Sequence, residues 1–170
     1  MAEWFDLLQK SIWCGVAAVG FGILFNVPRR TLWAIALLGL AGGVTKFTVL
    51  LYGNGIIIAS LLASIIVGFL SIPAAHRKHS PPMIFAIPSV IPMVPGAFAY
   101  RTMLGLINLT GNVTSETYST LMQETVNNGL KTLFVLMSLA VGVFFPMLIS
   151  RRETFKQIRT KGDEPTQKQE

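Results

Sequence analysis

The sequence predicts an all-α integral membrane protein with about five transmembrane helices. Its 170 residues are 52% hydrophobic and only 13% charged, whereas a soluble domain carries about 25% charged residues. Apolar runs of about 20 residues recur, and each is long enough to cross the roughly 30 Å hydrocarbon core as a helix. All eight acidic residues lie outside these runs. We therefore expect a membrane domain over residues 1–150 and a basic, polar tail over residues 151–170.

The first two expected spans cover residues 7–25 and 31–51. Gly15, Ala18 and Gly22 give the first span a face of small residues that another helix can approach closely. No small-residue cleavage site ends this span, so we expect it to be retained rather than removed as a signal peptide.

The third and fifth expected spans cover residues 56–75 and 129–150. In the third, small residues at positions 60, 64 and 68 recur every four residues, a pattern typical of close helix packing. Residues 115–127 mix polar and apolar side chains at helical spacing. They predict a short amphipathic helix at the membrane surface, too short to span.

The fourth expected span, residues 82–109, is interrupted by Pro88, Pro92, Pro95 and Gly96. Each interior proline removes a helical hydrogen bond, and hydrocarbon offers no water to the freed carbonyls. Alternatively, three prolines on one helical face could bend a packed helix without breaking it. Because a glycine follows them directly, we favour a real break, which in many transporters forms a binding site near the bilayer midplane.

Two cations close to this region are candidate ligands for an anion. If a second half-helix begins near residue 97, Arg101 lies one turn into it. Its guanidinium and the free amides of the helix start would then bind a carboxylate. Alternatively, Arg101 extends to the membrane surface or donates to carbonyls freed by the prolines. Lys46 lies about five residues from the outer end of the second span, where it either extends to the interface or contacts substrate.

The basic residues predict how the chain is oriented. They gather in alternate segments, at Arg29–Arg30, at Arg77–Lys78 and in the tail. Under the positive-inside rule the N-terminus lies outside and the C-terminus in the cytoplasm of a bacterial inner membrane. Full crossing by the fourth span is favoured over re-entry, because re-entry would place the basic tail outside. Since these charges flank membrane segments, nucleic acid is not an expected partner.

The sequence offers no group of residues suited to catalysis or to a cofactor. It has neither a carboxylate pair within a span nor a glycine-rich phosphate loop. His76 and His79 have no acidic or thiol neighbours to complete a metal site, and Cys14 lies in an apolar run, as a packing residue would. We expect neither an enzyme, nor a metal, nor a cofactor.

The run Ile87–Gly96, followed by Ala99–Tyr100–Arg101, resembles the C-terminal half of the threonine/serine exporter family. The start of the second span, Val27–Arg30, and the five-span layout fit as well, so the resemblance covers most of residues 10–150. Some members carry both halves in one chain, whereas others are split, with a small subunit like this one. The split form most similar to this chain is associated with the export of succinate.

The resemblance implies a secondary exporter of small carboxylate-bearing metabolites, either succinate and other dicarboxylates or threonine and serine. It implies two partners besides the bilayer, namely a small anionic metabolite and a larger membrane subunit with the N-terminal half; an oligomer is left open. By the same resemblance the substrate-binding positions are Pro88, Pro92, Pro95, Gly96, Tyr100 and Arg101, to which the charge argument adds Lys46. The alternative function is an accessory membrane scaffold that stabilises a partner without binding substrate.

Overall fold

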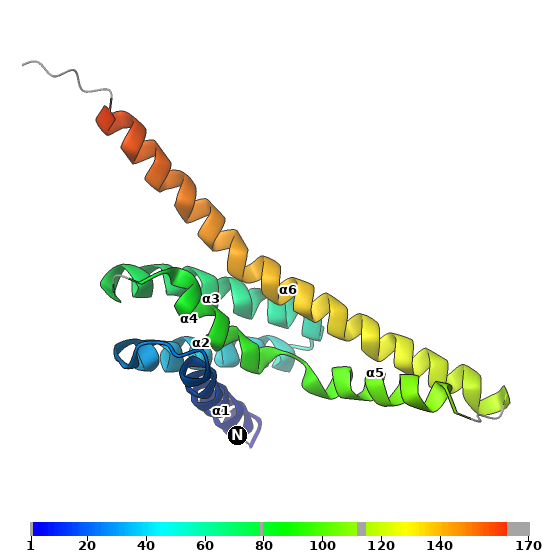
Figure 1. Ribbon diagram of the computed structural model, residues 1–170. Coiled ribbons are helices and arrows are strands. Elements are labelled where there is room, and N and C mark those ends of the chain that lie inside the picture. Colours follow the sequence, from blue (N-terminus) through cyan, green and yellow to red (C-terminus); the bar gives the residue numbers. More distant parts are fainter. Residues whose placement is uncertain (1, 79, 112–114, 163–170) are drawn as a thin grey trace, which may run out of the picture.

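Figure 1 shows a computed structural model of the chain, which describes residues 2–78, 80–111 and 115–162. The regular structure of these residues is entirely helical. Its elements are α1 (Ala2–Leu24), η1 (Arg29–Thr31), α2 (Leu32–Leu51), α3 (Ile56–Lys78), α4 (Pro82–Val90), η2 (Ile91–Met93), α5 (Gly96–Leu109) and α6 (Ser115–Gly162). Four helices are long and apolar enough to cross a membrane, and the bent pair of α4 with α5 supplies a fifth candidate span. The predicted fold class is therefore confirmed.

Small residues bring α1 and α2 into close contact. Gly15, Ala18 and Gly22 are all buried, as the predicted face requires. A Cβ atom added at Gly39 of α2 would lie 2.6 Å from the Cβ of Ala18 and 3.3 Å from the Cα of Gly15. The two backbones can approach this closely only because glycine has no side chain at these positions.

A second row of small residues joins α3 to α6. Ser60, Ser64 and Gly68 are fully or nearly fully buried. The Ser64 hydroxyl donates a hydrogen bond of 3.2 Å to the Ser138 carbonyl of α6. A Cβ atom at Gly68 would lie 3.1 Å from the Gly142 carbonyl oxygen. The spacing of small residues thus identified a real helix interface.

The turn between α2 and α3 reverses the chain and brings basic residues to one end of the bundle. Gly53 has φ +77°, a left-handed conformation that favours glycine. Because α2 and α3 then run in opposite directions, the start of α2 meets the end of α3. The Lys78 ammonium lies 5.2 Å from the centre of the Trp33 ring, across the two helices. The predicted anchors at Arg29–Arg30 and Arg77–Lys78 therefore share one end of the bundle.

The fourth span is broken, as its prolines predict. The short helix η2 follows α4 directly, Val94 is extended with φ −61° and ψ 133°, and α5 starts at Gly96. The two halves are bent by 58°. The α5 half has 14 residues, which gives a length of about 21 Å, too short to cross a membrane alone.

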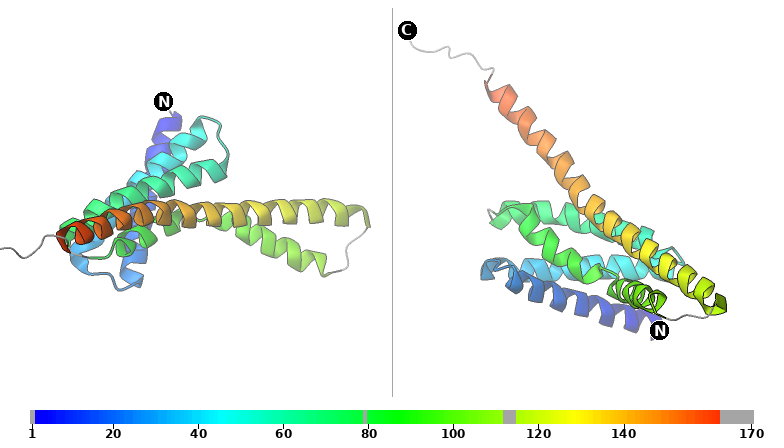
Figure 2. Two further views of the ribbon diagram at one scale, coloured as in Figure 1. Left: turned by 90° about the horizontal axis from the view of Figure 1, so that it is seen from above. Right: turned by 45° about the vertical axis from the view of Figure 1, so that its right-hand side comes forward.

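Beyond the break, α5 leaves the bundle and packs chiefly on α6. The two helices run antiparallel: Lys131 lies 5.6 Å from the centre of the Phe98 ring, and Gly105 meets Thr125. Since α6 contacts α3 only further along, near Ser138 and Gly142, the pair extends past the bundle. Figures 1 and 2 show this projection, which we call the α5–α6 hairpin (residues 96–109 and 115–131).

One expected element differs from the structure. Residues 115–127 do not form a separate short helix but are the first part of α6, which has 48 residues. The helix continues through Gly129 because α5 covers this position: a Cβ there would lie 3.3 Å from the Thr102 side chain. The helix α6 also continues into the expected tail, as far as Gly162. His79 and residues 163–170 lie outside the described residues.

Candidate functional site

Lys46 lies at the helix break and is buried, with an exposed fraction of 7%. Its ammonium donates a hydrogen bond of 2.6 Å to the carbonyl of Met93, the last residue of η2. The break deprives this carbonyl of its helical partner, so Lys46 replaces the missing donor. The interpretation of Lys46 as a side chain that extends to the interface is therefore wrong. Lys46 instead donates to a carbonyl freed by the break, which is one of the roles considered above for Arg101.

Tight packing holds this junction of α1, α2 and η2 together. A Cβ atom at Gly42 would overlap the Met93 side chain and lie 2.7 Å from Val67 Cγ2. On the other side of α2, Cys14 packs on Gly43, with 3.1 Å between the Cys14 Cβ and an added Cβ. Cys14 is thus a packing residue at the break.

The remaining residues of the proline-rich stretch differ widely in exposure. Pro88 and Pro95 are buried and Pro92 is half-buried, whereas Gly96 is exposed and Tyr100 is 65% exposed. At the start of α5, the Gly96 amide donates to the Val94 carbonyl at 2.9 Å. The Phe98 and Ala99 amides donate to the Pro95 carbonyl. This helix start therefore leaves fewer free amides for an anion than the sequence analysis assumed.

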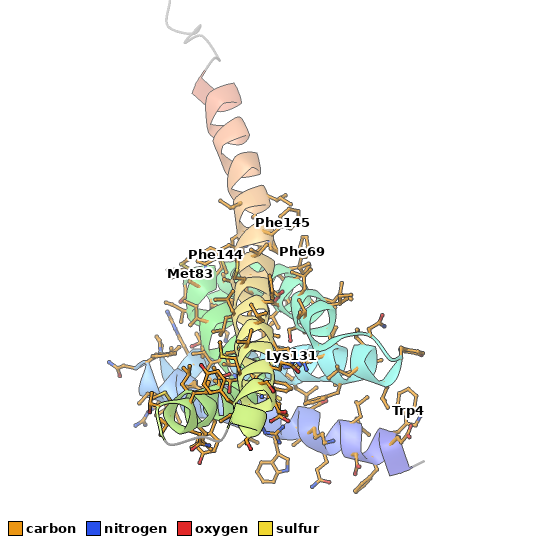
Figure 3. All side chains as sticks on the ribbon, turned by 90° about the vertical axis from the view of Figure 1, so that its right-hand side faces the viewer. Trp4, Phe69, Met83, Lys131, Phe144 and Phe145 are labelled. Atoms are coloured by element: carbon orange, nitrogen blue, oxygen red, sulfur yellow. The ribbon has the colours of Figure 1, made fainter. Side chains whose placement is uncertain are left out.

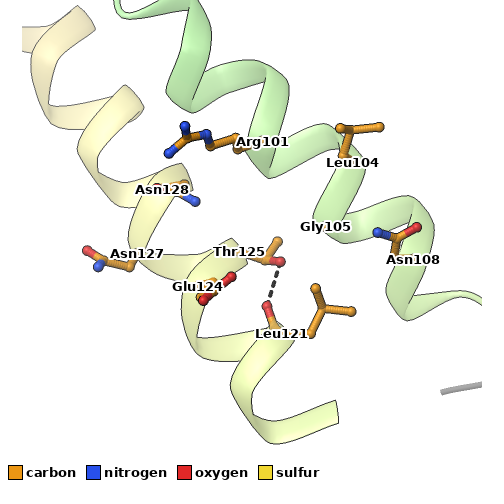
Figure 4. Close-up of a pocket in the computed structure, with 9 residues that line it drawn as sticks. All are labelled: Arg101, Leu104, Gly105, Asn108, Leu121, Glu124, Thr125, Asn127 and Asn128. Atoms are coloured by element: carbon orange, nitrogen blue, oxygen red, sulfur yellow. Dashed lines mark hydrogen bonds between the residues drawn. The ribbon is translucent and has the colours of Figure 1, made fainter. Parts of the chain in front are cut away.

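Arg101 lies in the hairpin, where its side chain extends from α5 toward α6 (Figure 4). It lines a cavity of about 450 Å³ between the two helices. The other lining residues are Leu104, Gly105, Asn108, Leu121, Glu124, Thr125, Asn127 and Asn128. The structure thus places Arg101 beside polar residues of α6, and not beside Lys46 or the three prolines.

The floor of this cavity is set by a close approach of the two helices. A Cβ atom at the buried Gly105 would overlap the Thr125 side chain, so only glycine fits here. Thr125 directs its hydroxyl to its own helix, with a hydrogen bond of 2.7 Å to the Leu121 carbonyl. On either side of this contact the helices carry larger polar residues, which line the cavity.

Sequence reasoning missed the polar residues of α6 that face Arg101. Glu124 and Asn127 fall within the expected surface helix of residues 115–127, Asn128 follows it, and none of the three was considered as a site residue. A signal was present, because Arg101, Gly105 and Asn108 recur at intervals of four and three residues, which puts them on one helical face. Their partner face on α6 could not be identified from sequence, because the hairpin register depends on the Gly105–Thr125 contact.

The outer surface of the bundle is apolar. Phe69 of α3 and Phe144 and Phe145 of α6 project away from it (Figure 3) and are about half exposed. A soluble monomer rarely exposes contiguous apolar surface on this scale. Together with the lengths of the helices, this surface is that of a multi-pass membrane protein.

Comparison with known proteins places the chain in a family. The sequence profile of a family described as threonine/serine exporter, ThrE, matches residues 10–149. The chain belongs to the threonine/serine exporter family. No solved structure matches this chain.

One relative within the threonine/serine exporter family is an uncharacterized protein of Haemophilus influenzae. It is 30% identical over 147 residues, which cover 86% of this chain and 48% of the relative. The chain therefore spans about half the length of this curated relative.

Proposed function

We propose that this chain is one half of a secondary exporter of small carboxylate-bearing metabolites. The cargo is either an amino acid such as threonine or serine, or a dicarboxylate such as succinate. A larger membrane subunit supplies the other half of the transport path. Membership of the exporter family and the doubled length of the Haemophilus relative support this proposal.

The observation that carries the proposal is the broken fourth span with a buried cation at the break. A charged side chain inside a bilayer costs about 2.5–3.5 kcal/mol or more and is usually kept for function. Lys46 bears this cost with a single carbonyl partner, since no ion pair of Lys46 occurs in the described part of the chain. An anionic solute would supply the missing countercharge.

We further propose that the substrate path runs from the hairpin to the break. Arg101 lies in the first half of α5, and Lys46 contacts Met93 at the end of η2, so the path would carry two cations in succession. The other proposed substrate-binding residues lie along the same stretch of sequence. Pro88 and Pro92 precede Met93, and Pro95, Gly96 and Tyr100 lie between Met93 and Arg101. The hairpin side faces outward if the basic end of the bundle is cytoplasmic, which the positive-inside rule favours in a bacterial inner membrane.

Efflux from cells lacking both subunits tests the proposal. The cells would receive this chain alone, the larger subunit alone, or both, and release of labelled succinate, threonine and serine would be followed. We expect efflux of one solute class only when both chains are present. Efflux with this chain alone would contradict the need for a partner, and no efflux of any of the three would contradict the proposed cargo.

Exchange of Arg101 for lysine separates a transport subunit from a scaffold. We expect Arg101→Lys to reduce efflux about tenfold or more, because lysine lacks the planar fork that holds a carboxylate by two hydrogen bonds. Co-purification of the two chains should be unchanged. Wild-type efflux in this variant would favour the scaffold alternative.

A further inference from the structure

We propose that a groove between α2 and α3 binds an anionic phospholipid. One acyl chain lies in the apolar part of this α2–α3 groove, and the phosphate of the headgroup contacts Arg77 and Lys78 at one end. Neither Lys46 nor Met93 lines the groove, and it shares no lining residue with the hairpin cavity. The inference is therefore separate from the proposed transport path and from the choice of solute.

The groove is long, hollow and mostly apolar. It has a volume of about 580 Å³, and its lining runs from Trp33 to Ala41 on α2 and from Leu70 to Lys78 on α3. Each of these stretches rises about 12 Å along its helix, and alanines at three lining positions leave the space between them open. The side chains of Leu37 and Leu70 are about half exposed. An acyl chain can therefore enter the groove from the surrounding lipid.

Charge is confined to one end of the groove. Arg77 and Lys78 are the last residues of α3, and the other lining residues carry no charge. The Lys78 ammonium lies 5.2 Å from the centre of the Trp33 ring on α2, so a cation and an aromatic ring close this end. Tryptophan and basic residues are typical of the membrane interface, where phospholipid headgroups lie. Arg29 and Arg30 of η1, just before α2, add two exposed cations at the same end of the bundle.

These four cations have no anionic partner close by. The sequence has no acidic residue between Asp6 and Glu116, and Asp6 lines a cavity with Leu50, at the opposite end of α2. Among the side chains that the structure describes, none of the four cations forms an ion pair. Basic side chains at the membrane surface attract anionic lipid headgroups. A phosphate bound here would supply the missing countercharge.

A phospholipid matches the groove better than other occupants, because it has both of the parts that the groove can bind. A free phosphate would contact the cations and leave the apolar lining without a partner. An apolar helix of another protein would cover the lining and leave the cations without a countercharge. An anionic lipid satisfies both, with its headgroup at the basic end and an acyl chain along the helices.

A second groove provides an internal comparison. It measures about 480 Å³ and lies on the opposite side of α3, where Ile72 and His76 face the start of α4 and Phe144 of α6. The residues that line it include neither lysine nor arginine. His76 is engaged with its own helix, since its Nδ1 atom lies 2.8 Å from the Ile72 carbonyl oxygen. This α3–α6 groove can hold an acyl chain but should not select an anionic headgroup.

The test is binding of phospholipids to the purified full chain, followed by native mass spectrometry. The probes are phosphatidylglycerol, which is anionic, and phosphatidylcholine with the same acyl chains, which is zwitterionic. We expect one phosphatidylglycerol to bind at least about tenfold more tightly than phosphatidylcholine, because two cations contact its headgroup. Equal affinity for the two lipids would overturn the proposal. Displacement of phosphatidylglycerol by inorganic phosphate would also overturn it and would indicate a site for a soluble anion.

Removing the two cations locates the headgroup. The double variant Arg77→Gln/Lys78→Gln should bind phosphatidylglycerol about tenfold more weakly and phosphatidylcholine as the wild type does. The matched control is Lys131→Gln, because Lys131 also lies over an aromatic ring, 5.6 Å from the centre of Phe98, but in the hairpin. This control should keep the affinity of the wild type. Unchanged affinity in the folded double variant, or an equal loss in Lys131→Gln, would overturn the assignment.

Filling the groove locates the acyl chain. Ala41→Leu adds an apolar side chain to the α2–α3 groove without changing its charge, and it should weaken phosphatidylglycerol binding about tenfold. Ser150→Leu adds an apolar side chain to the α3–α6 groove instead and should leave this affinity unchanged. Helical content and elution volume would show that each variant is folded. Wild-type affinity in a folded Ala41→Leu variant would overturn the placement of the acyl chain in the α2–α3 groove.

Discussion

Replacing Gly68 with leucine is expected to detach α6 from α3 and to prevent stable folding. A Cβ atom at this position would lie 2.9 Å from Pro146 Cγ and 3.1 Å from the carbonyl oxygens of Gly142 and Val143. Because two of these neighbours are backbone atoms, they cannot move aside by a change of rotamer. Overpacking costs about 1–3 kcal/mol and occasionally more, and we expect a loss of about 3 kcal/mol. Thermal unfolding followed by size-exclusion chromatography measures it.

The matched control is Gly20→Leu in α1, where an added Cβ meets nothing within 4 Å. This change adds the same side chain and removes the same conformational freedom, so it should leave the unfolding temperature nearly unchanged. An equal loss in both variants would contradict the steric explanation and indicate a general effect of replacing glycine in a membrane helix.

Replacing Lys46 with methionine is expected to abolish transport with little change in stability. Methionine removes the cost of burying an ammonium group but leaves the Met93 carbonyl without its donor, and an unsatisfied buried carbonyl costs about 1–3 kcal/mol. These two effects oppose each other in the free energy of unfolding. Efflux, which we propose to depend on the charge at the break, should fall more than about tenfold, a change of about 1.4 kcal/mol.

The control for this variant is Lys10→Met, which removes an exposed cation from α1. Its efflux should stay within about twofold of the wild type, since surface charges contribute little. If Lys46→Met showed the same efflux as the wild type, at equal amounts of protein in the membrane, the buried amine would serve only to donate a hydrogen bond to the Met93 carbonyl.

The spans and the break could be predicted because they depend on local properties. Length and apolarity define a span wherever it packs, and three prolines followed by glycine interrupt a helix in any surroundings. The row of small residues at Ser60, Ser64 and Gly68 also predicts a helix interface, because small side chains allow two helix backbones to approach closely. Sequence could not name the partner of this row, which is α6.

The pairing of charged residues could not be predicted, because it depends on contacts far apart in the sequence. Lys46 and Met93 are separated by 47 positions, and only the fold brings the ammonium to that carbonyl. In the same way, Glu124 lines the same cavity as Arg101 only because α6 begins beyond the bundle and runs back along α5. A surface helix over residues 115–127 satisfied the local pattern equally well, and only the packing of α5 on Gly129 and Thr125 decides against it.

The length of α6 has a mechanical consequence. A helix of 48 residues measures roughly 72 Å, more than twice the hydrocarbon thickness. It rests on α3 where Gly142 meets Ser64, so this contact is a fulcrum with the hairpin on one side and the basic end of the helix on the other. Tilting such a stiff rod by about 10° moves its two ends in opposite directions, each by several ångströms. The hairpin cavity and the basic end of α6 thus lie on one continuous helix, on opposite sides of its contact with α3.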